Sequence, residues 1–262
     1  MRIIVPEYFE MTYNELVQCF LKKYGAAKYN YFHTPECKSY NKMNSRTKEG
    51  LEIHHIDENK YPMLSASWAK AMPFECQKAE RLVYVNVFEH LLLHIKIWEE
   101  EYKKCLISGK SPILGHPGIY FISNRINDYF SKDSPPKGWN ENMFNVVADY
   151  YDDYVSEIKY HLCNIASFYP NKDKTLYQEI VRIIKRRDGI FNQELYNRLT
   201  EDYRNVFKLL IGDIVEHKVY GVGIVKKMQY KDERFFYVTV DFEKVGEKEV
   251  LGNFAGIKRV EA

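Results

Sequence analysis

The hydrophobic and polar positions of the chain follow a helical period over much of its length. Residues 11–25, MTYNELVQCFLKKYG, place apolar residues three to four positions apart, which predicts a helix that ends at Gly25. The same spacing recurs in residues 143–168, in TLYQEIVRIIKRRDG and in FNQELYNRLTEDYRNVFKLLIG. The middle of the chain is therefore expected to be helical.

The period changes to two in the last part of the chain and in two short runs near its start. From Gly212, β-branched or aromatic residues alternate with charged ones and glycines interrupt them, which predicts a small barrel of about five strands. The runs GLEIHH (50–55) and RLVYV (81–85) predict two further strands. Helices and strands are thus segregated along the chain, as in an α+β protein.

Two breaks in the pattern, at residues 108–118 and 131–140, suggest a multidomain chain. We expect three parts, at 1–110, 111–210 and 211–262. The helical middle part has the outline of a helix-turn-helix, in which EDYRNVFKLL (201–210) would enter a DNA groove. The alternative is a helical spacer or interface.

Composition and charge allow a folded core but do not by themselves identify a partner. The 262 residues are 45% hydrophobic and carry a net charge of +2, so a basic surface can only be local. One such stretch interleaves basic residues with tyrosines and either binds a nucleic-acid backbone or forms a solvated face. Its basic candidates are Lys28, Lys38, Lys42, Arg46 and Lys48.

Cysteine usage favours reduced thiols. The chain has five cysteines and no CxxC motif, which predicts a cytoplasmic protein without a disulfide framework. Cys37 and Cys76 lie on either side of the adjacent histidines His54 and His55 and could join a zinc site. Their spacing matches no zinc pattern, however, so buried or idle thiols are expected. The longest apolar clusters, such as HLLLHIKIW, are shorter than the roughly 18–20 residues of a membrane span. No membrane association is expected.

Histidines carry the candidate chemistry. His54 and His55 end the first short strand, where neighbouring side chains point to opposite faces, so the two histidines cannot share one task. After the second strand, His90 and His94 lie four residues apart and leave one face of a predicted helix. Imidazole is a common ligand of zinc, nickel and similar metals.

The segments EIHHID and RLVYVNVFEHLLLH resemble an HNH endonuclease of the His-Me finger, or ββα-metal, group. The resemblance covers about residues 51–105. It implies one divalent metal ion (Mg, Mn, Ni or Zn) and cleavage of DNA phosphodiester bonds. It also implies that His54, His90 and His94 bind the metal and that His55 is the general base.

The chain departs from that family at Arg81. Family members carry an asparagine nine residues before the first helical histidine, and here that position holds Arg81. The geometry of the long connecting loop is therefore open. Asn86 lies nearby but is expected to cap the following helix, with Glu89 three residues on. Asp57 is a further residue that could orient the site.

The C-terminal pieces GDIVEH, YGVGIV, VDFEKVG and FAGIK resemble the Tudor-like, SH3-like module that ends repair helicases of the UvrD/PcrA type. The resemblance implies docking on RNA polymerase, DNA or another macromolecule, without chemistry of its own. The alternative is a barrel that only packs against the rest of the chain.

Together these features predict a metal-dependent DNA endonuclease with a docking module. Restriction or anti-phage defence and a phage or mobile-element role are both compatible with it, and a homodimer would help a double-strand cut. RNA is an alternative substrate because this chemistry does not require deoxyribose. The main alternative is a non-catalytic protein that binds nucleic acid or RNA polymerase and uses the metal site as a structural clip.

Overall fold

The structure is a computed structural model with a mixed α/β fold. The residues it describes are 2–108, 112–131, 136–168, 173–203, 209, 212–230, 236–251 and 256–260. They form two compact units, residues 1–164 and residues 165–262. Each unit is described by itself below.

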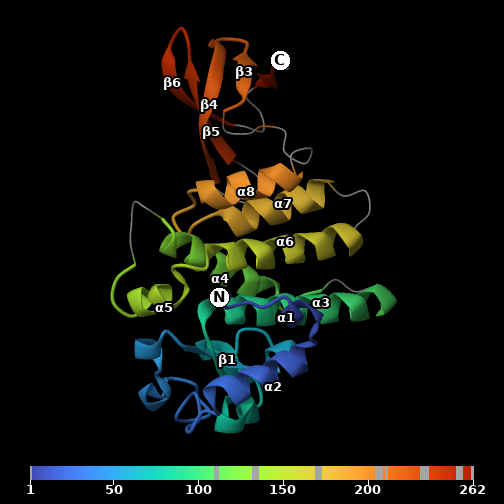
Figure 1. Cartoon of the computed structure of the whole chain (residues 1–262), viewed down its shortest axis with the longest axis vertical. Helices are drawn as coiled ribbons and strands as arrows, with labels where there is room; N and C mark the ends of the chain where they lie inside the picture. The colour runs from blue at the N-terminus through green and yellow to red at the C-terminus, as the bar shows by residue number, and fades with distance from the viewer. Residues whose placement is uncertain are drawn as a thin grey trace. The chain divides into compact units, whose positions relative to one another are not determined.

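The first unit combines a two-stranded sheet with helices (Figure 1). Its strands are β1 (Glu52–His55) and β2 (Leu82–Val85). Its helices are α1 (Glu7–Glu10), α2 (Tyr13–Tyr24), α3 (Val87–Ser108), α4 (His116–Tyr129), α5 (Trp139–Val147) and α6 (Tyr151–Phe168), the last of which runs into the second unit. The short 3-10 turns are η1 (Lys42–Asn44), η2 (Thr47–Glu49), η3 (Ile56–Asn59), η4 (Ser67–Ala71), η5 (Phe74–Gln77) and η6 (Ala79–Arg81).

Helix α2 forms where the apolar spacing predicts it. A capping box starts the helix, because the Thr12 side chain accepts from the Glu15 N–H and the Glu15 side chain accepts from the Thr12 N–H. Gly25 ends it with a φ of 80°, a conformation that costs glycine little. One face of the helix buries Tyr13 and Phe20 completely. This face brings Tyr13 to the end of β1, where it becomes part of the site.

Strands β1 and β2 pair antiparallel, with His54 opposite Val83 and His55 opposite Leu82. The chain enters α3 directly after β2. An apolar stripe attaches α3 to the core, since Leu91, Ile95, Trp98 and Tyr102 are all buried.

Helix α4 packs closely on α3. A Cβ atom on Gly115 would lie 2.6 Å from the His94 carbonyl oxygen, so only glycine fits at this contact. The region that the sequence suggested as a break, 108–118, thus contains the start of a helix that supports the histidine-bearing one.

The second unit contains α7 (Asp173–Ile184), α8 (Gln193–Tyr203) and a five-stranded antiparallel sheet in the order β6-β5-β4-β3-β7. The strands are β3 (Ile214–His217), β4 (Gly221–Tyr230), β5 (Phe236–Phe242), β6 (Gly246–Leu251) and β7 (Lys258–Arg259). Val215, Val225, Val240 and Phe242 are buried on one side of this sheet. The predicted β region is confirmed, whereas its closure into a barrel stays a prediction.

Several sequence-based expectations remain predictions after the fold is known. The domain boundaries at residues 110 and 210 stay predictions. The helix-turn-helix also stays a prediction, because residues 204–208 and 210 lie outside the described residues. Within the described part of the chain, none of the helices combines the length and the apolar character that a membrane span requires.

Candidate metal centre

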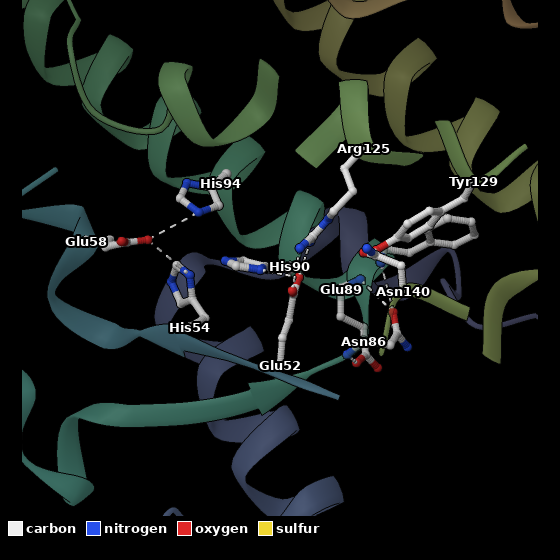
Figure 2. A network of polar contacts seen from close by, with 11 residues as sticks. Glu52, His54, Glu58, Asn86, Glu89, His90, His94, Arg125, Tyr129 and Asn140 are labelled. Atoms are coloured by element: carbon white, nitrogen blue, oxygen red, sulfur yellow. Dashed lines mark hydrogen bonds and ion pairs between the residues drawn. The ribbon is translucent and has the colours of Figure 1, made fainter. Parts of the chain in front are cut away.

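Three histidines and one glutamate meet inside the first unit. His54, Glu58, His90 and His94 each offer one ligand atom, and these atoms all lie within 4.8 Å of one another. Figure 2 shows the carboxylate of Glu58 between His54 and His94, with His90 beside them. His54, Glu58 and His94 are buried and His90 is half-buried. The structure therefore brings together the three histidines that the sequence singled out and adds a carboxylate.

The local backbone explains this convergence. His54 faces the cluster from β1, and the 3-10 turn η3 follows at once and returns the chain so that Glu58 lies next to it. His90 and His94 come from the first two turns of α3, on one face. Asn86 starts this helix as predicted: its side-chain oxygen accepts from the N–H groups of Phe88 and Glu89, both at 3.0 Å.

A tyrosine from α2 fixes the orientation of His54. The Tyr13 hydroxyl donates to the Ile56 carbonyl oxygen at 2.9 Å and lies 2.8 Å from His54 Nε2. Because a carbonyl oxygen only accepts, the single hydroxyl proton goes to Ile56, and His54 must donate from Nε2. Nδ1 of a neutral His54 then keeps its lone pair and is the nitrogen that faces Glu58, 3.4 Å from Oε2.

Glu52 holds His90 in a similar way. Glu52 Oε1 accepts from His90 Nδ1 at 2.7 Å, and the carboxylate also receives the guanidinium of Arg125, with Nη1 2.8 Å from Oε2. Burial raises the pKa of Glu52, but Arg125 and His90 outweigh burial and hold that pKa below its usual value. The carboxylate is therefore ionised and accepts from Nδ1–H, which leaves Nε2 of His90 to bind a metal.

His94 and Glu58 are fixed by backbone contacts. His94 Nε2 lies 3.2 Å from Glu58 Oε2, while the other edge of the ring lies against Gly118 of α4. A Cβ atom on Gly118 would come within 2.2 Å of His94 Nδ1, so α4 leaves room for the ring only because residue 118 is glycine. Glu58 Oε1 accepts from the Leu64 N–H at 3.1 Å, which turns Oε2 toward the histidines.

The electrostatics of the cluster favour metal binding. Burial lowers the pKa of His54 well below its usual value, and the neighbouring histidines lower it further. Burial likewise lowers the pKa of His94. These imidazoles are therefore neutral at neutral pH, which is the form that binds metals.

The geometry of the cluster also fits a metal ion. Nδ1 of His54 is buried and has no hydrogen-bond partner among the described residues. Two ligand atoms bound to one zinc ion at about 2.0–2.2 Å lie roughly 3.3 Å apart in a tetrahedral arrangement. The separations of 3.4 Å (His54 to Glu58) and 3.2 Å (His94 to Glu58) match that edge. Three imidazoles and one carboxylate suit zinc, nickel or manganese.

His55 lies on the opposite side of β1, as strand alternation predicts. Its Nε2 is 3.0 Å from the side-chain oxygen of Gln77, and its ring contacts the ring of Tyr31 with 4.4 Å between centroids. His55 is 1% exposed. Burial lowers its pKa, so this imidazole is also neutral at neutral pH.

An ion pair closes the loop between η3 and β2. Arg81 binds Asp57 through two hydrogen bonds, Nε to Oδ2 at 2.7 Å and Nη2 to Oδ1 at 2.6 Å. These bonds, together with the ammonium of Lys60, lower the pKa of Asp57 to about 2. Since Asp57 directly precedes Glu58, the ion pair between Arg81 and Asp57 holds the end of the loop next to the cluster. Arg81 and Asp57 thus join the two ends of the loop whose geometry the sequence left open.

The basic candidates fall into two groups. Lys28, Lys38, Lys42 and Lys48 are exposed. Arg46 is half-buried and has structural contacts: it pairs with Glu49, donates to the Tyr24 carbonyl at 2.6 Å and covers the Tyr84 ring. Cys37 and Cys76 are buried together in an apolar cluster with Phe32 and Leu64.

Sequence reasoning missed the residues that complete and support the histidine cluster. These residues are Tyr13, Glu52, Glu58, Gln77, Gly118 and Arg125. For Glu58 a signal existed, because a carboxylate four residues after a ligand histidine lies within reach if a helical turn follows. Glu52 carried a local signal too, because it lies two residues before His54 on the same face of the strand. The others come from distant segments and carry no local signal.

Comparison with known proteins identifies only the C-terminal part. Residues 211–259 match the family model of the PcrA/UvrD tudor domain. A comparison with curated proteins finds no match for the chain. The match covers less than half of the chain and coincides with the five-stranded sheet of the second unit. The C-terminal part of the chain is therefore Tudor-like, similar to the tudor domain of PcrA and UvrD.

Proposed function

We propose that the chain is a metal-dependent endonuclease of the HNH type that hydrolyses phosphodiester bonds in DNA. One observation carries this proposal: a buried cluster of His54, Glu58, His90 and His94 lies on one face of β1, and a neutral histidine, His55, lies on the other. The order of β1, β2 and α3 is also that of a ββα-metal motif.

In this proposal the cluster holds one divalent metal ion. When bound, the metal supplies Lewis acidity that polarises the scissile phosphate and stabilises the departing oxygen. His55 accepts a proton from water while the water oxygen attacks phosphorus and one phosphorus–oxygen ester bond breaks. A neutral imidazole is suited to this step near neutral pH, and general-base catalysis of this kind contributes roughly 10²–10⁴ in rate.

The Tudor-like part would recruit the nuclease to its site of action. Docking on RNA polymerase or on DNA is the role we propose for residues 211–259, by analogy with the matched family. Exposed lysines of the first unit, such as Lys28 and Lys42, would contact the phosphate backbone.

A second function is favoured by two specific observations. Four side chains suffice to fill a tetrahedral metal site, which is typical of structural zinc, whereas catalytic zinc keeps one position open. His55 is also 1% exposed, so substrate must displace part of its cover to reach it. The alternative is a non-catalytic protein that binds nucleic acid or polymerase and uses the metal as a clip.

Cleavage of supercoiled plasmid separates the two functions. The wild type and His55→Ala are freed of metal with a chelator and then receive Mg²⁺, Mn²⁺, Ni²⁺ or Zn²⁺ singly. The nuclease proposal expects metal-dependent nicking by the wild type and a loss of roughly 10²-fold or more in the variant. Metal content, measured by mass spectrometry, is expected to be equal in the two proteins because His55 is not in the cluster.

His33→Ala is the matched control, since His33 is an exposed histidine outside the cluster. It is expected to cleave like the wild type. If the wild type binds metal but cuts neither DNA nor RNA with any of the four ions, the structural-clip function replaces the nuclease.

A further inference from the structure

The side chain of Gln77 lies fully buried between His55 and the loop that precedes it. Its amide nitrogen donates to the Leu64 carbonyl oxygen at 3.1 Å, and its amide oxygen lies 3.0 Å from His55 Nε2. Its backbone carbonyl accepts from the Tyr31 N–H at 2.7 Å. Gln77 thus joins three segments that are far apart in the sequence.

The hydrogen-bonding capacities of these groups fix the tautomer of His55. The Leu64 carbonyl only accepts, so the NH₂ of Gln77 must point toward it and the amide oxygen must point toward His55. That oxygen also only accepts, so His55 Nε2 carries the hydrogen. The lone pair of the neutral ring is then on Nδ1, which has no hydrogen-bond partner among the described residues.

Leu64 connects this arrangement to the metal centre. Its N–H donates to Glu58 Oε1 at 3.1 Å, while its carbonyl accepts from Gln77. Leu64 is itself fully buried, so the two hydrogen bonds are shielded from water. One loop residue therefore holds both the carboxylate of the cluster and the amide that faces His55.

We propose that Gln77 is a positioning residue that holds His55 in the Nε2–H tautomer and presents Nδ1 as the proton acceptor. The proposal rests on the proposed function insofar as His55 is the general base. The Tyr31 ring, in edge contact with His55, restricts rotation of the imidazole and supports the same orientation. A wrong tautomer would offer an N–H instead of a lone pair to the attacking water.

The test is ¹⁵N NMR of the full chain labelled with ¹⁵N-histidine. The wild type, Gln77→Met and Gln77→Glu are compared at a pH where His55 is neutral. The two ring nitrogens give distinct shifts when one carries the hydrogen, and His55→Ala assigns the signals. The wild type is expected to hold His55 as Nε2–H. Gln77→Met is expected to show a mixture of tautomers, and Gln77→Glu, which still accepts from Nε2, to restore the single one.

Plasmid cleavage supplies the second readout. Gln77→Met is expected to lower kcat roughly 10–100-fold with KM changed by less than about twofold, because the defect lies in the proton acceptor and not in DNA binding. Asn127→Leu removes another buried amide, on α4, and is the matched control for loss of packing. It is expected to change neither the His55 signals nor kcat.

The outcomes separate this inference from the nuclease proposal. An Nδ1–H tautomer of His55 in the wild type overturns the role of Gln77, even if Gln77→Met does not fold. A single tautomer in Gln77→Met overturns it as well. If the expected tautomers are found but the wild type cleaves no nucleic acid, Gln77 still positions His55 and only the nuclease function fails.

Discussion

At the scale of single residues, the tautomers of His54 and His90 depend on hydrogen bonds made by the ring nitrogens that point away from the cluster. Tyr13 accepts from His54 Nε2, and Glu52 accepts from His90 Nδ1. Each acceptor leaves the opposite nitrogen as the lone-pair donor. Groups of this kind orient metal ligands, and their loss typically costs 10–100-fold in affinity.

Tyr13→Phe is therefore expected to lower metal affinity roughly tenfold or more. The substitution removes only the hydroxyl that accepts from His54 Nε2, so the Nδ1 lone pair is no longer enforced. Competition with a chromophoric chelator measures the affinity. Tyr154→Phe is the matched control, because it removes another buried hydroxyl, bonded to Asn127 at 3.0 Å, outside the cluster. Equal affinities in the two variants would contradict the role of Tyr13.

A buried carboxyl group outside the cluster predicts a pH effect on stability. Glu157 is 0% exposed, and neither carboxylate oxygen has a hydrogen-bond partner among the described residues. Burial raises the pKa of Glu157 well above its usual value, and Asp153 raises it further. With the folded-state pKa raised, this carboxyl group favours folding below the unfolded-state pKa, and that contribution is lost as pH rises through the folded-state value.

Glu157→Gln is expected to remove this dependence. At pH 7–8 the variant should be more stable than the wild type, because folding then no longer has to bury a group that is ionised in the unfolded chain. Urea unfolding between pH 4 and pH 8 measures the difference. Glu75→Gln, at an exposed position in the same unit, should show no such pH-dependent gain. If the free energies of unfolding of Glu157→Gln and the wild type differ by the same amount at every pH, the expected ionisation of Glu157 is contradicted.

At the scale of elements, α4 acts as the support of α3. Gly115 and Gly118 let the two helices approach closely at His94, and Arg125 of the same helix holds Glu52. The histidine face of α3 thus depends on a helix that the HNH resemblance does not cover. We therefore expect metal binding to depend on this helix pair.

Gly118→Ala tests that coupling. The added Cβ would lie 2.2 Å from His94 Nδ1, so the ring cannot keep its present position beside Glu58. Metal affinity is expected to fall by roughly tenfold or more, while the helical circular dichroism signal is retained. Phe121→Ala, an exposed position on α4, serves as the control and should bind metal like the wild type. Unchanged affinity in Gly118→Ala would indicate that α4 is not part of the site.

At the scale of the whole molecule, the candidate metal centre lies within the first compact unit. We expect a chain ending at residue 168 to retain bound metal and, on the proposed function, plasmid cleavage. A chain ending at residue 110 lacks Gly118 and Arg125 and is expected to lose metal. Metal content per chain, by mass spectrometry, distinguishes them. If the shorter chain is fully occupied by metal, the ββα segment is sufficient to form the site and α4 is not required.

Much of the local order was predictable from the sequence. The opposite orientations of His54 and His55 follow from strand alternation, and the shared face of His90 and His94 follows from the helical period. The Asn86 cap and the β region after Gly212 follow from equally local rules. These features need only the geometry of a few consecutive residues.

The tertiary structure alone decided which groups the histidines meet. Tyr13, Gln77 and Arg125 lie far from the histidines in sequence, and no periodicity relates them. Their positions depend on how α2, the loop after η3 and α4 pack around β1 and α3. The sequence by itself thus singled out the three histidines that meet in the cluster, and only the packing of distant segments decided which groups fix the tautomers of His54 and His90. The physical reason is that hydrogen-bond partners are chosen by proximity in space, which local backbone geometry does not specify.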